Sequence, residues 1–163
     1  MKLKFAGVSL LLFIAAGCHS VDVAIQPHED AGELEALSRA VHEKVNAHRE
    51  ANGLAALQLH EGISRIARRK SAAMAQGGSF THVGFNTVRA RQINQVIAYR
   101  RIGENLAYNT NHDDPAARAV QMWLDSPGHR ENVEHPDYRV TGIAAARSEK
   151  GTIYFTQLFV MPR

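Results

Sequence analysis

The hydrophobic pattern changes its period near His135-Pro136, and this change constrains the fold more than any other feature of the chain. Before this point, apolar residues recur at three- and four-residue steps; after it, two β segments follow, at 138–146 and 152–160. The four residues 148–151, Ser-Glu-Lys-Gly, can join these segments as a hairpin. Helices first and an antiparallel pair last predict an α+β layered domain.

Four segments with helical spacing precede the hairpin. The first runs from Glu33 to a stop at Asn52-Gly53, and the second carries apolar residues from Leu59 to Met74. A more polar third helix is expected at 86–99. The fourth begins at Pro115 behind two aspartates and leads into the turn Ser-Pro-Gly at 126–128, which is itself a helix start.

The first seventeen residues have the layout of an export signal. Lys2 and Lys4 precede an apolar run that is too short to span a bilayer, and small residues follow. The sequence AAGC at 15–18 resembles the lipobox of bacterial lipoproteins, where cleavage falls before a cysteine that is then acylated. Cys18 is the only cysteine, so the chain cannot form an internal disulfide, and lipidation would remove its free thiol. The alternative is a secretory signal or uncleaved anchor with an incidental cysteine.

These features divide the chain into three parts. We expect a signal peptide at 1–17, a lipidated Cys18 with a tether at 18–32, and one globular domain at 33–163. The expected location is the bacterial cell envelope, at the outer membrane or the cell surface, with the membrane contacted through the N-terminal lipid. Cleavage removes Lys2 and Lys4 but no acidic residue, which lowers the net charge from +3 to +1. This small charge gives no support to nucleic-acid binding.

The sequence contains nine histidines, so a metal enzyme is the first functional class to consider. Three pairs resemble the start of the zinc-protease motif H-E-x-x-H: His28-Glu29, His42-Glu43 and His60-Glu61. None has the second histidine four residues on. His129 and His135 are six residues apart, about 120° out of alignment on a helix, so one helix could not direct both to a metal. The sequence also lacks a G-x-S-x-G elbow, a phosphate loop and a dinucleotide fingerprint.

Three motifs in order resemble the CAP superfamily: GENLA at 103–107, WLDSPGHREN at 123–132 and YFTQLF at 154–159. The superfamily groups cysteine-rich secretory proteins, antigen 5 and plant pathogenesis-related proteins, and this chain resembles its disulfide-free bacterial branch. The resemblance extends over about residues 33–160. It implies an α-β-α sandwich with an antiparallel sheet between helical layers, including a third strand that periodicity does not show.

The resemblance also implies a surface cleft. In members with the full set, two histidines and two glutamates converge there and can hold a divalent cation; by motif, three of these are His82, Glu104 and His129. The position of the second glutamate is Ser126, so the set is incomplete. Two histidines and one carboxylate still suit zinc, since three protein ligands leave one position open. Without metal, the same trio could form a polar cluster in which Glu104 orients one imidazole. The supporting motif residues are Asn105, Ser126, Asn132 and Gln157.

Two functions remain open at this stage. The first is a lipid-tethered binding module whose cleft holds zinc or another divalent metal, a lipid or a glycan without turnover. The second is a zinc-assisted hydrolase of peptides or envelope polymers, in which His82, Glu104 and His129 hold the metal and a bound water attacks. We favour the first, because a metal site alone does not establish catalysis. A third alternative is structural: these residues and Asn105 would satisfy backbone groups and hold the turn.

Overall fold

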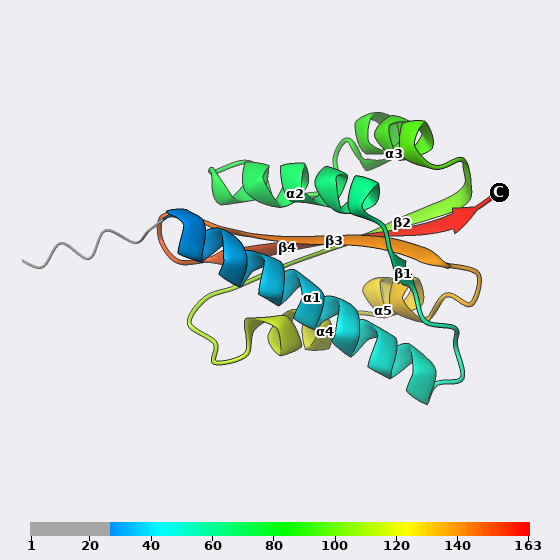
Figure 1. Ribbon diagram of the computed structural model, residues 1–163, viewed down its shortest axis with the longest axis horizontal. Coiled ribbons are helices and arrows are strands. Elements are labelled where there is room, and N and C mark those ends of the chain that lie inside the picture. Colours follow the sequence, from blue (N-terminus) through cyan, green and yellow to red (C-terminus); the bar gives the residue numbers. More distant parts are fainter. Residues whose placement is uncertain (1–26) are drawn as a thin grey trace, which may run out of the picture.

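The structure, a computed structural model, describes residues 27–163 (Figure 1). The predicted signal peptide, Cys18 and the first part of the tether lie outside these residues. In chain order, the elements are α1 (Pro27–Ala51), β1 (Gln58–Leu59), α2 (Glu61–Ala75), the π-helical turn η1 (Phe85–Arg89), α3 (Ala90–Val96), β2 (Tyr99–Asn109), α4 (Pro115–Asp125), α5 (Pro127–Glu134), β3 (Val140–Arg147) and β4 (Ile153–Pro162). Within 27–163, no helix is both long and apolar enough to cross a bilayer.

The described strands form one sheet in the order β1-β3-β4-β2, with a helical layer on each face. Figure 1 shows α2 and α3 on one side of the sheet and α1, α4 and α5 on the other. The predicted hairpin is β3 and β4, which pair antiparallel, and β2 pairs antiparallel with the far edge of β4. The predicted α-β-α sandwich is therefore confirmed. One detail differs, because the two-residue β1 pairs parallel with β3 and makes the sheet mixed.

Each face of the sheet covers its own apolar core. The larger core joins α1, α4 and α5 to the sheet and includes Trp123, whose indole N–H donates to the Leu106 carbonyl at 3.0 Å. The smaller core joins α2 and α3 to the opposite face. Helix α2 approaches β3 closely at Gly142, where a Cβ would lie 2.3 Å from the Ile63 carbonyl carbon. Both helical layers are thus held tightly to one sheet.

The first helix begins at Pro27, six residues earlier than Glu33, so residues 27–32 belong to the helix and not to the tether. Proline is well accommodated in the first helical turn. The early turns are also fixed by Arg147 at the end of β3, which pairs with Asp30 at 3.2 Å and with Glu33 at 2.6 Å. These two ion pairs connect residues far apart in sequence, and helical periodicity therefore did not show them.

The segment 86–99, expected to be one helix, contains two helical pieces and the start of a strand. The turn η1 precedes α3, which ends at Val96, and Tyr99 already belongs to β2. Strand β2 carries the GENLA motif. Its central residues are buried and include the polar Glu104 and Asn105. A strand with buried polar residues has no clear two-residue hydrophobic period, which explains why only the resemblance indicated it.

Candidate functional site

His82, Glu104 and His129 converge on one groove of about 370 Å³. They come from three separate elements: the loop before η1, strand β2 and the first turn of α5. The predicted cleft residues are therefore brought together. The lining residues are His82, Phe85, Ile102, Gly103, Glu104, Ser126, Gly128, His129 and Asn132. A larger hollow of about 520 Å³ between α2 and the β3–β4 hairpin has no histidine in its lining and contains none of the predicted site residues.

Glu104 is the buried centre of the site. Its side chain is 1% exposed, and its Oε1 lies 2.9 Å from His82 Nδ1. Arg89 Nη2 donates to the same oxygen at 2.9 Å, and Arg89 Nε lies 2.5 Å from Oε2. The Nε contact lacks hydrogen-bond alignment, so Oε2 has no hydrogen-bond donor within residues 27–163. The guanidinium nevertheless neutralises the buried carboxylate, as burial of a charge requires.

Arg89 is a functional residue that the sequence did not reveal. Its side chain is 10% exposed and extends from η1 towards β2. Besides Glu104, it donates to the carbonyls of His82 at 3.1 Å and of Val83 at 3.2 Å. Its guanidinium carbon lies 5.9 Å from the Phe85 ring centroid. Arg89 therefore fixes both the carboxylate and the loop that carries His82.

The two imidazoles face each other across the groove. Their ring centroids are 5.9 Å apart, and His82 is the more open of the two, with 51% of its side chain exposed. Burial, and then the neighbouring His82, lower the pKa of the His129 imidazole. Neutral His129 can donate from one ring nitrogen and accept at the other. The pair can therefore serve a ligand that both gives and takes hydrogen bonds.

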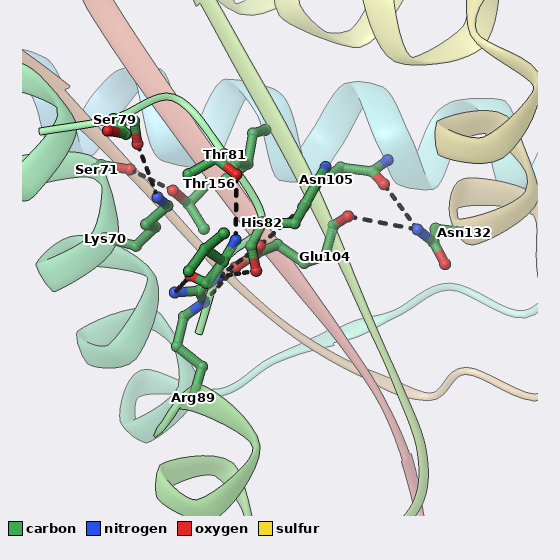
Figure 2. Close-up of polar contacts among 12 residues, drawn as sticks. Lys70, Ser71, Ser79, Thr81, His82, Arg89, Glu104, Asn105, Asn132 and Thr156 are labelled. Carbon is green, nitrogen blue, oxygen red and sulfur yellow. Dashed lines mark hydrogen bonds and ion pairs between the residues drawn. The ribbon is translucent and has the colours of Figure 1, made fainter. Parts of the chain in front are cut away.

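Helix α5 is held against β2 by two asparagines. Asn105 is fully buried, and its Nδ2 donates to the His129 carbonyl at 2.9 Å. Asn132 Nδ2 donates to Asn105 Oδ1 at 2.9 Å, and its contact with the Glu104 carbonyl is longer, at 3.5 Å. Figure 2 shows Asn132 facing Asn105, while Arg89 and His82 approach Glu104 from the other side of the strand. Asn105 and Asn132 thus set the position of His129.

The other two motif residues lie in different surroundings. Ser126 lines the groove and is the residue immediately before α5. Gln157 is fully buried in β4 opposite Asn105, and its Nε2 donates to Thr141 Oγ1 at 3.1 Å. It therefore belongs to the sheet interior and does not reach the groove. The structure brings Ser126, Asn105 and Asn132 to the site, but not Gln157.

Lys70 is a second cation whose charge interacts with the carboxylate. Its ammonium donates to the Ser79 carbonyl at 3.3 Å. Burial, and then the charge of Arg89, lower the pKa of Lys70, while Glu104 raises it. The chain therefore surrounds Glu104 with its own positive charges.

These residues do not fit a zinc site of the kind that the resemblance implies. Zinc ligands need free lone pairs about 2.0–2.2 Å from one shared point. Here both oxygens of Glu104, the carboxylate that would be the third ligand, contact Arg89, and Ser126 supplies no second carboxylate. Among the residues that the structure describes, no three histidine, cysteine or acidic side chains are grouped as metal ligands. The site is arranged as a hydrogen-bonded cluster.

Known proteins share this sequence pattern and this fold. The sequence model of the cysteine-rich secretory protein (CAP) family matches residues 42–159. The chain is 32% identical to the Bacillus subtilis protein YkwD over 129 residues, which is 78% of this chain and 48% of that protein. It is also 32% identical to the B. subtilis membrane protein YlbC over 117 residues, 71% of this chain and 32% of YlbC. The chain thus spans half or less of these relatives.

Two solved structures share the fold at lower sequence identity. An outer surface protein of Borrelia burgdorferi superposes with a TM-score of 0.69 and 19% identity, covering 79% of this chain and 95% of that one. An extracellular protein with an SCP domain from Bacillus anthracis superposes with a TM-score of 0.68 and 22% identity, covering 83% of this chain and 44% of that one. The motifs, the sandwich and these matches agree: the chain belongs to the CAP family of cysteine-rich secretory proteins.

Proposed function

We propose that this protein is an exported lipoprotein, anchored through Cys18, whose CAP domain binds a glycan of the cell envelope without chemical turnover. The export signal and the lipobox-like AAGC support the location. Its fold neighbours are described as an outer surface protein and an extracellular protein, which supports export as well. The tether then holds the groove within a short distance of the membrane.

The observation that carries the binding role is the pair of imidazoles, His82 and His129, facing each other across an open groove. Beside them lie the hydroxyl of Ser126 and the amide of Asn132, with Phe85 as an apolar wall. Hydrogen-bond donors and acceptors around an apolar surface suit a hydroxyl-rich ligand. An acyl chain is less well matched, because polar side chains make up much of the lining of this groove.

The hydrolase alternative has less support from the site. It requires zinc on His82, Glu104 and His129, and Arg89 contacts the carboxylate that would be the ligand. The groove also contains no cysteine, and its one hydroxyl, on Ser126, makes no hydrogen bond to an imidazole among residues 27–163. Binding is therefore the role that these side chains favour.

Co-sedimentation with purified peptidoglycan sacculi tests the proposal. The detergent-extracted protein should sediment with sacculi, and His82→Ala and His129→Ala should each lose most of this binding. His112→Ala is the matched control, because His112 is exposed in the loop between β2 and α4. Failure of the unmodified protein to sediment would reject a glycan ligand. Release of soluble wall fragments that His129→Ala abolishes would instead establish turnover.

The anchor has its own test. Cys18→Ser should abolish labelling by a fatty-acid probe and move the protein out of the membrane fraction. Unchanged labelling would reject the lipoprotein assignment, and sacculus binding would not be affected by that result.

A further inference from the structure

The groove already contains a permanent cation at its carboxylate. Arg89 lies within 2.9 Å of Glu104 Oε1 through Nη2 and within 2.5 Å of Oε2 through Nε. The two side chains are 10% and 1% exposed, so solvent hardly screens the contact. A guanidinium stays protonated at every pH at which proteins are folded. Any second cation that approached Glu104 would meet this charge.

Arg89 cannot easily move away from the carboxylate. It also donates to the carbonyls of His82 and Val83, and turning outwards would leave both without this donor. Its guanidinium carbon also lies 5.9 Å from the Phe85 ring centroid, within cation–π distance. The ammonium of Lys70 lies on the same side and is itself affected by the charges of Arg89 and Glu104. The positive charge is therefore fixed in place by the fold.

We propose that Arg89 determines the class of ligand that the groove accepts: its guanidinium takes the electrostatic place of a divalent cation at Glu104, so that the groove is complete without metal and excludes divalent ions. His82 and His129 then remain free for an uncharged or anionic ligand. Arg89 acts through Glu104 and the His82 loop, and is a positioning residue. This inference concerns the charge of the groove and is independent of the glycan proposal.

Zinc titration by calorimetry, on the same detergent-extracted protein, tests the inference. The unmodified protein should bind no stoichiometric zinc. Arg89→Gln removes the charge at similar length and should bind one zinc ion at least about tenfold more tightly, a change of the size that groups around metal ligands produce. Adding His129→Ala to Arg89→Gln should abolish the new binding. Arg89→Lys keeps the charge and should not gain zinc.

Arg91→Gln is the matched control, because Arg91 is an exposed arginine two residues further along, in α3. It should behave like the unmodified protein. Two results would overturn the proposal: stoichiometric zinc in the unmodified protein that is lost in both His82→Ala and His129→Ala, or a folded Arg89→Gln that gains none.

A second measurement keeps the test valid if Arg89→Gln does not fold. Zinc added to the unmodified protein should leave the NMR signals of the His82 and His129 rings unshifted. Shifts of both signals that saturate at one equivalent would contradict the proposal. Loss of sacculus binding would not bear on this result, so failure of the two proposals can be told apart.

Discussion

Replacing Asn105 by alanine should loosen the contact between helix α5 and the edge strand β2. The buried amide bridges the two elements, since Nδ2 donates to the His129 carbonyl and Oδ1 accepts from Asn132, each at 2.9 Å. Alanine removes both contacts and preserves the strand backbone. The first turn of α5, which carries His129, would then lose its direct polar link to the strand.

The size of the effect follows from these contacts. Each lost hydrogen bond costs about 1 kcal/mol net, and leaving the partly buried Asn132 amide with only its 3.5 Å contact to Glu104 adds about 1 kcal/mol. We therefore expect the free energy of unfolding to fall by about 3 kcal/mol. For a domain of this size, the melting temperature should fall by about 10 °C.

Urea and thermal denaturation followed by circular dichroism measure this loss. Asn94→Ala is the control, because Asn94 is exposed on α3 and its replacement should change the free energy of unfolding by less than about 0.5 kcal/mol. Asn105→Ala should also weaken sacculus binding, although every groove side chain is present. A stability loss below about 0.5 kcal/mol would refute the bridging role. Full stability loss with unchanged binding would show that Asn105 does not position His129.

Three further predictions concern other parts of the fold. Arg49→Met removes the buried donor to the carbonyls of Ala55, Val133 and His135 and should lower the free energy of unfolding by about 3 kcal/mol in urea titrations. Gly142→Ala places a Cβ 2.3 Å from backbone of α2 and should cost about 3 kcal/mol in the same assay. The lowered pKa of His129 means that the unfolded chain binds the proton more readily. Stability should therefore fall as the pH drops through 6.5 towards the folded pKa, level off below it, and depend less on pH in His129→Gln.

The elements that the sequence predicted well are those with one buried face. Helices α1, α2 and α4 show three- and four-residue apolar spacing because each covers the sheet with one stripe. The hairpin β3–β4 was recognised from its short connection and its β-rich segments. The strand β1 has only two residues, both exposed, so it has no period to detect. Its pairing with β3 depends on tertiary contacts alone.

The site was predictable only where a motif marked it. His82, Glu104 and His129 were identified by resemblance, and all three line one groove. Arg89 lies in a polar segment beside Arg91, and nothing local distinguishes the buried arginine from the exposed one. Arg89 could have been found from the chemical requirement of Glu104. A buried glutamate with no divalent partner needs a counter-charge, and a nearby arginine is the residue that supplies it most often with hydrogen bonds.

The position of β2 explains how one groove can draw on both helical layers. β2 is the edge strand on its side of the sheet, and successive side chains in a strand point to opposite faces. Glu104 therefore points to the layer of α2 and α3, where Arg89 and His82 contact it (Figure 2). Asn105 points to the layer that contains α5 and donates to the His129 carbonyl. Two consecutive residues thus hold the His82 imidazole and the backbone of His129 from opposite faces of one strand. Strand β2 therefore couples the two histidines, because Glu104 contacts the His82 ring and Asn105 holds the turn of α5 that carries His129.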